Sequence, residues 1–144
     1  MNYLADVNVW IALAVVGHVH HSIALAWFEE SQTGEILFTR VTQMGLLRLL
    51  TNRKVMGVNV LTVADAWRVY GSLCDDDRVQ YAEEPPHLED SWREAAIHSG
   101  TGQNFWTDAY LAAFAEAGKY TIVTFDRGFL RHRGLDVRLL MPAV

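Results

Sequence analysis

The sequence contains one cysteine and no long apolar run, and these absences narrow the class of protein. The single residue Cys74 leaves no disulfide to form within the 144 residues, which fits a reducing compartment, and we expect a cytoplasmic protein. No stretch approaches the roughly 20 apolar residues that cross a bilayer, and no signal peptide is evident. We therefore expect no membrane partner.

Several common enzyme motifs are also missing. The sequence contains no Gly-rich phosphate loop, nucleophile elbow or dinucleotide fingerprint. Hydrophobic residues make up 51% of the chain and charged residues 20%, which is typical of a folded globular protein. The length is sufficient for a substantial core, so we predict one domain over residues 1–144.

The net charge of −5 is unevenly distributed. Residues 75–94 contain eight acids and two arginines, so this segment carries −6 and the remainder +1. The acid run is interpreted as a solvated face, because it lacks calcium-loop spacing. A local basic surface is still expected near the carboxyl terminus, which contains Lys119, Arg127, Arg131, Arg133 and Arg138.

Short apolar strands alternate with amphipathic helices, which predicts a three-layer α/β/α sandwich with a mainly parallel central sheet. Asn8 and Asn104 are expected to cap helices, and residues 53–60 and 99–103 to form loops. The predicted strands are 2–5, 36–38, 79–81, 120–125 and 137–140. The predicted helices are 8–15, 21–33, 42–52, 62–73, 88–98, 104–117 and 127–131.

Two of the predicted strands end at an aspartate. Asp6 follows the first strand and Asp126 follows the strand at 120–125. In open α/β sheets, ligands gather outside the carboxyl ends of the strands, so both acids are expected at one site. Alternatively, each aspartate could serve only as the N-cap of the helix that follows it.

Asp108 is the third candidate acid. In the helix 104–117 it shares a face with Phe105, Leu111 and Ala112, and an acid on an apolar stripe needs a partner. It could be a buried acid bonded to a nearby Thr or Arg. If the three acids converge, two charges about 4 Å apart repel by roughly 4 kcal/mol at an effective dielectric near 20. A divalent cation would offset this repulsion, and an oxygen-only site suits Mg²⁺ or Mn²⁺.

The other polar and aromatic clusters have simpler interpretations. The cluster of His18, His20 and His21 is expected to be a solvated loop or helix start. The five tryptophans are expected to be mainly core residues. They are Trp10, Trp27, Trp67, Trp92 and Trp106.

Four segments together resemble the PIN domain family, and most closely its VapC-type toxins of bacterial toxin–antitoxin pairs. They occur in the family's order and span nearly the whole chain. They are Leu4-Ala5-Asp6-Val7-Asn8-Val9-Trp10, residues 42–52, Trp106-Thr107-Asp108-Ala109-Tyr110-Leu111-Ala112 and Thr124-Phe125-Asp126-Arg127-Gly128-Phe129.

The resemblance implies a Mg²⁺- or Mn²⁺-dependent endoribonuclease in which Asp6, Asp108 and Asp126 bind the metal. It also implies a homodimer and inhibition by a cognate antitoxin. Asn8 and Thr124 would be polar neighbours of the site. Arg127, Arg131 and Arg133 would contact RNA phosphates or pair with antitoxin acids, or would only form a solvated basic helix end.

Gln43 departs from the family pattern, because it stands where we expect a glutamate. It shares a helix face with Leu47 and Leu50, so we expect it to point inward, and we include it among the catalytic residues. An amide oxygen can bind a hard cation but brings no charge, which places the second ion of a two-metal mechanism in question. Two other functions remain open: a catalytically weakened binding module and a small-molecule phosphohydrolase with an aspartate nucleophile.

Overall fold

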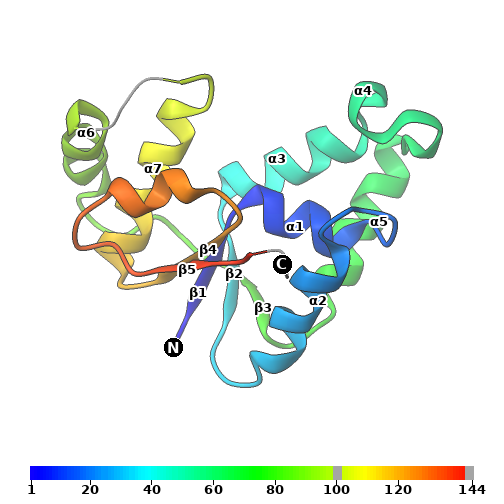
Figure 1. Cartoon of the computed structure of the whole chain (residues 1–144), viewed down its shortest axis with the longest axis horizontal. Coiled ribbons are helices and arrows are strands. Elements are labelled where there is room, and N and C mark those ends of the chain that lie inside the picture. The colour runs from blue at the N-terminus through cyan, green and yellow to red at the C-terminus, as the bar shows by residue number, and fades with distance from the viewer. Residues whose placement is uncertain (99–101, 142–144) are drawn as a thin grey trace.

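The computed structural model describes residues 1–98 and 102–141, and within them a five-stranded sheet lies between two layers of helices (Figure 1). The strand order is β3-β2-β1-β4-β5, and every neighbouring pair is parallel. The predicted three-layer sandwich is therefore confirmed.

The elements alternate along the chain as the apolar pattern predicts. The strands are β1 (Tyr3–Ala5), β2 (Ile36–Phe38), β3 (Val79–Tyr81), β4 (Thr121–Thr124) and β5 (Val137–Leu139). The helices are α1 (Val7–Ala14), α2 (His21–Glu30), α3 (Arg40–Leu50), α4 (Arg53–Met56), α5 (Val63–Cys74), α6 (Leu88–His98) and α7 (Phe105–Gly118). Two 3₁₀ segments complete the order, η1 (Gly57–Asn59) and η2 (Arg127–Arg131).

The strands separate two hydrophobic cores, because successive side chains on a strand point to opposite faces. On β2, Ile36 and Phe38 join the core formed with α1, α2, α3 and α5, whereas Leu37 joins the core formed with α6 and α7. In Figure 1, α6 and α7 lie on one side of the sheet and α1, α2 and α5 on the other. Both faces are covered, which explains why the strands are nearly all apolar.

The central pair of strands brings two distant acids to the same edge. β1 pairs with β4 in parallel register, with Tyr3 opposite Thr121 and Ala5 opposite Val123. The Asp6 N–H continues this ladder and donates to the Val123 carbonyl at 2.9 Å. The residues that follow β1 and β4 therefore emerge side by side.

Helix α7 is enclosed by the protein over most of its length. Seven consecutive residues, from Ala109 to Ala115, are buried. Four of them are alanine, and their small side chains let neighbouring elements approach closely. Asp108 stands one position before this buried stretch.

Several predicted caps and boundaries were wrong. Asp6, not Asn8, caps α1: its backbone is extended and its Oδ1 accepts from the Val7 N–H at 2.7 Å. Asn104 is at the N-cap position of α7 but makes no side-chain capping bond. Helix α3 begins at Arg40, because Thr39 and Thr42 form a reciprocal capping box.

Other differences concern short segments. Residues 53–60 were predicted as a loop, but Asn52 caps the short helix α4 there and η1 follows it. Helix α2 ends at Glu30, where the Ser31 hydroxyl donates to the Trp27 carbonyl. The loop predicted at 99–103 lies partly outside the described residues, since 99–101 are not described. None of the helices in the described part of the chain is long and apolar enough to span a membrane.

Candidate active site at the carboxyl edge of the sheet

The three predicted acids line one cavity at the carboxyl edge of the sheet, which we call the acid cavity. Asp6 lies at the end of β1, Asp126 follows β4, and Asp108 projects from the first turn of α7. Residues of α1, α3 and α7 form the remaining walls. Asp6 is 7% exposed, whereas Asp126 is exposed, so the cavity leads from solvent to a buried carboxylate.

A threonine hydroxyl connects the two strand ends. Thr124 Oγ1 donates to Asp6 Oδ2 at 2.8 Å and accepts from the Asp126 N–H at 3.0 Å. Asn8 lies beside it, with its Oδ1 accepting from the Phe125 N–H at 3.3 Å. The expected placement of Asn8 and Thr124 beside the acids agrees with this geometry.

Asp6 and Asp126 also cap the segments that follow them. Asp6 Oδ1 accepts from Val7, and Asp126 Oδ1 accepts from the Gly128 N–H at 2.8 Å at the start of η2. Asp6 and Asp126 therefore do both things that the sequence allowed: each caps the following segment, and both line one cavity. Each cap fixes the position of its carboxylate and leaves the other oxygen for a different partner.

The acids raise the free energy of one another's charged forms. Burial raises the pKa of Asp6, the Thr124 and Val7 hydrogen bonds oppose this shift, and the charge of Asp126 adds to it. For Asp108, burial and then the charges of Asp6 and Asp126 raise the pKa to about 6, while Arg131 acts in the opposite direction. Perturbation of this kind is common at functional sites.

The carboxylates do not form a preassembled metal cage. In the described part of the chain, no group of three or more His, Cys, Asp or Glu side chains is close enough to hold an ion as it stands. The acids nonetheless share one cavity and act on one another electrostatically. Their oxygen-only chemistry suits Mg²⁺ or Mn²⁺, and the side chains would have to move to gather around an ion.

Gln43 is buried as predicted, but the structure places it in a different environment. Its Oε1 accepts from Arg40 Nη1 at 2.6 Å, and the Tyr70 hydroxyl is a further partner. The Arg40 guanidinium also covers the Tyr81 ring at 4.8 Å. Gln43 is not one of the described residues that line the acid cavity.

The face of α3 that borders the acids carries residues that sequence reasoning missed. Thr42, Gly45 and Arg48 line the acid cavity, together with Asn104 at the start of α7. Leu49 lines the acid cavity too, and residues 42, 45 and 49 follow helical spacing, so the signal was present in the sequence. This signal was missed because the face that contains Gln43, Leu47 and Leu50 also follows helical spacing and is apolar.

The remaining candidates have different environments. Trp67 and Trp106 are 52% and 63% exposed, so the prediction that all the tryptophans are mainly core residues was wrong for these two. His20 stacks on Phe125 with ring centroids 4.7 Å apart, and His21 contacts the Ala12 carbonyl through Nδ1. His20 and His21 therefore stand at the start of α2, as one of the two interpretations expected, and His20 also packs against the residue that follows β4.

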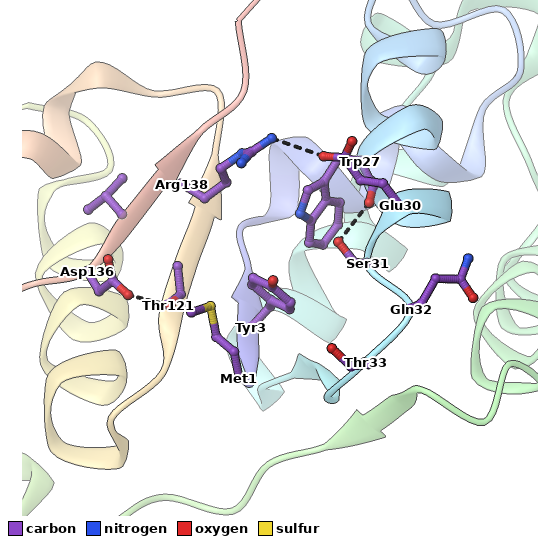
Figure 2. Close-up of a pocket in the computed structure, with 11 residues that line it drawn as sticks. Met1, Tyr3, Trp27, Glu30, Ser31, Gln32, Thr33, Thr121, Asp136 and Arg138 are labelled. Carbon is purple, nitrogen blue, oxygen red and sulfur yellow. Dashed lines mark hydrogen bonds and ion pairs between the residues drawn. The ribbon is translucent and has the colours of Figure 1, made fainter.

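A separate cavity lies at the opposite, amino-terminal end of the strands (Figure 2). Trp27 and Tyr3 meet edge to face on one side, and the Arg138–Glu30 ion pair crosses it at 3.0 Å. Thr121 donates to Asp136 at 2.7 Å on the other side. Each of its charged side chains thus has a partner in the cavity wall: Glu30 and Arg138 pair with each other, and Asp136 accepts from Thr121.

Comparison with known proteins agrees with this fold. The sequence model of the PIN domain family matches residues 3–135. Ribonuclease VapC41 of Mycobacterium tuberculosis is 46% identical over 142 residues, which cover 95% of this chain and 97% of that protein. Ribonuclease VapC39 of the same species is 42% identical over 126 residues, covering 88% and 89%. The chain belongs to the PIN domain family and, within it, to the VapC proteins.

Solved structures share the fold at low sequence identity. A chain in the crystal structure of VapBC2 from Rickettsia felis, bound to a DNA fragment from its promoter, superposes with a TM-score of 0.74 at 15% identity, covering 98% of this chain and 100% of that one. VapC20 of Mycobacterium tuberculosis, described as a sarcin–ricin loop cleaving toxin, gives 0.67 at 18% identity, covering 90% and 93%.

Proposed function

We propose that this protein is a Mg²⁺- or Mn²⁺-dependent endoribonuclease that acts as a toxin. The observation that carries the proposal is the convergence of Asp6, Asp108 and Asp126 on one cavity. The similarity to proteins named Ribonuclease VapC41 and VapC39 supports RNA as the substrate. Hydrolysis would add water across a P–O bond, so that one product strand ends in a phosphate and the other in a hydroxyl.

Asp6, Asp108 and Asp126 are the residues that would hold the cation. When bound, the cation would supply positive charge against the carboxylates and against the charge that develops on the phosphodiester. Thr124 and the Val7 N–H hold Asp6 in one orientation through 2.8 and 2.7 Å hydrogen bonds. The Gly128 N–H does the same for Asp126.

One ion is better supported than two. Gln43 is engaged with Arg40, and Gly45 occupies the part of α3 that borders the acids. A Cβ added at Gly45 would come within 2.8 Å of Val7 Cγ2, so this position has no room for a larger side chain without movement of Val7. We therefore propose Gln43 as a residue that supports the fold of α3 and not as a ligand.

The phosphohydrolase alternative is less well supported. Such an enzyme would want a second acid two residues after its aspartate nucleophile, and Asn8 stands at that position after Asp6. A weakened binding module remains the main rival, and an activity measurement separates it from an active nuclease.

The partners are proposed from the relatives. Several related structures are named VapBC, which supports a cognate antitoxin as the partner of this chain. We further propose a homodimer and a cytoplasmic location, with residues 1–144 forming one domain. Size-exclusion chromatography with light scattering, performed with and without the product of a neighbouring small gene, tests the assembly.

Cleavage of RNA by the purified, antitoxin-free protein tests the activity. We expect cleavage with Mg²⁺ or Mn²⁺, none with excess EDTA, and a loss of at least 100-fold in the Asp6→Asn variant. Asp77→Asn is the matched control, because Asp77 is an exposed acid outside the acid cavity. An absence of metal-dependent cleavage by a folded protein would favour the binding module.

A further inference from the structure

The cationic side chains of this protein fall into two groups that differ in their partners. Among the described residues, five arginine side chains bond to a side-chain acceptor, and these acceptors belong to Gln43, Asp65, Asp76, Glu89 and Glu30. These arginines are Arg40, Arg68, Arg78, Arg93 and Arg138. Within the described residues, no ion pair involves Arg48, Arg53, Lys54, Lys119, Arg127, Arg131 or Arg133.

Six of the seven unpaired cations lie on two sides of the acid cavity. Arg48, Arg53 and Lys54 belong to α3 and α4, whereas Arg127, Arg131 and Arg133 lie in η2 and just after it. Figure 1 shows α3 and α4 extending to one side of the start of α1, with the orange segment around residue 130 on the other. The acids therefore stand between two groups of cations that form no ion pair with the described residues.

One arginine from each group lines a cavity that also contains acids of the site. Arg48 lines the acid cavity and its guanidinium makes no hydrogen bond among the described residues. Arg131 lines the adjoining cavity, which shares Gln103, Asn104, Asp108 and Asp126 with the acid cavity. Its Nε donates to the Gly128 carbonyl at 3.0 Å, and this bond leaves its terminal nitrogens available.

An exposed guanidinium beside carboxylates would normally pair with them. Arg131 lines a cavity together with Asp108 and Asp126 but forms no ion pair with any described acid, so its charge stays available to a ligand. Guanidinium donors fit phosphate oxygens well, and single-stranded nucleic acid follows tracks of positive charge. A net charge of −5 does not prevent this, because the relevant cations are local.

We propose that Arg48 and Arg131 hold the RNA phosphates on either side of the one that is cleaved, so that the strand crosses the acids from α3 to η2. This proposal rests on the proposed ribonuclease function. The two arginines are binding residues that position the strand, and the acids hold the reacting group between them.

Binding measured as a function of salt tests the proposal. A labelled single-stranded RNA oligonucleotide is titrated with Asp6→Asn protein in Mg²⁺, so that binding is measured without turnover. For single strands, each phosphate contact contributes about 0.7 to the slope of log K against log salt. We expect Arg48→Gln and Arg131→Gln each to reduce the slope by about 0.7 and to weaken binding about tenfold at moderate salt.

Two further variants serve as controls. Arg93→Gln removes the same charge from α6, where Arg93 is paired with Glu89, and we expect the slope to stay unchanged. Arg48→Lys retains the charge and should restore most of the slope. In active protein, Arg48→Gln should raise KM and leave kcat within about threefold, a pattern that loss of uniform binding predicts.

The outcomes separate this proposal from the proposed function. Equal slopes in parent, Arg48→Gln and Arg131→Gln proteins, with RNA still bound and cut, would overturn the arginine track alone. The same loss in Arg93→Gln would also overturn it, since only net charge would then matter. Failure of the parent to bind RNA and of active protein to cut it would instead overturn the ribonuclease function.

Discussion

Thr124 Oγ1 donates a 2.8 Å hydrogen bond to Asp6 Oδ2 and so joins the ends of two strands that are 118 residues apart in sequence. The same oxygen accepts from the Asp126 N–H. A single hydroxyl therefore sets the relative positions of two of the three acids. The Thr124 side chain is fully buried, so no water can replace it without rearrangement.

Replacement of Thr124 by valine should test this relationship directly. Thr124→Val keeps the shape but leaves Asp6 Oδ2 and the Asp126 N–H without their partner, which should lower the free energy of unfolding by about 1–3 kcal/mol. We expect nuclease activity to fall by at least tenfold, because Asp6 loses its orientation. Chemical denaturation and RNA cleavage measure the two effects. Thr124→Ser keeps the hydroxyl, so a similar loss in that variant would contradict the explanation.

Asp108 should destabilise the metal-free protein at neutral pH. Its pKa of about 6 lies above the value of about 3.9 expected in an unfolded chain, so the folded state binds this proton more tightly. The corresponding stability is fully present at low pH and is lost as the pH rises through about 6. In EDTA, the Asp108→Asn variant should therefore have a higher Tm than wild type at pH 8, with a smaller difference at pH 5. A difference that grows toward low pH would reverse the assigned sign.

Divalent cations should favour wild type over Asp108→Asn in Tm, the reverse of the order expected in EDTA. A ligand that binds only the folded state stabilises it by RT ln(1 + [L]/Kd), which is about 2.7 kcal/mol at 100 times Kd. We expect Mg²⁺ or Mn²⁺ to raise the Tm of wild type and of Asp77→Asn, and to raise that of Asp108→Asn less. Differential scanning fluorimetry across a metal titration measures this effect. Equal gains in all three proteins would show that the ion binds elsewhere.

Gln43 should matter for stability more than for chemistry. Gln43→Ala removes the acceptor of the 2.6 Å bond from Arg40 and opens space beside Tyr70, so the free energy of unfolding should fall by about 1–3 kcal/mol. Because Gln43 does not line the acid cavity, kcat should stay within about threefold when the protein is assayed well below its Tm. A loss of more than 100-fold in kcat with unchanged stability would restore Gln43 to the catalytic group.

Gly45 should be sensitive to a single added carbon. In Gly45→Ala the new Cβ would meet Val7 Cγ2 at 2.8 Å, and Val7 supplies the N–H that holds Asp6. We expect activity to fall about tenfold or more, with at most a modest loss of stability. Gly71→Ala is the matched control: nothing lies within 4 Å of its added Cβ, and alanine in an exposed helix should stabilise by about 1 kcal/mol. Unchanged activity in Gly45→Ala would show that Val7 can move without disturbing Asp6.

The local sequence was sufficient for most elements because their apolar periods are regular. Strands β2 and β3 and helix α6 have the predicted bounds, since each is flanked by clear turn or cap residues. Errors occurred where two polar residues compete for one role. Asp6 and Asn8 can both cap α1, and only the extended backbone at Asp6, fixed by pairing of β1 with β4, decides between them.

The sequence by itself determined the alternating elements and placed Asp6 and Asp126 directly after predicted strands, because hydrophobic period and residue order are local properties. The pairing of β1 with β4 and the position of α7 brought these two acids and Asp108 to one cavity, which is a tertiary property. The tertiary structure decided which side chains of α3 face those acids. Neighbouring positions on a helix differ by about 100° in direction, so Gln43 turns toward Arg40 and Tyr70 while Thr42, Gly45 and Arg48 border the acid cavity. That choice depends on how α3 packs against the sheet, which no single segment of the chain specifies.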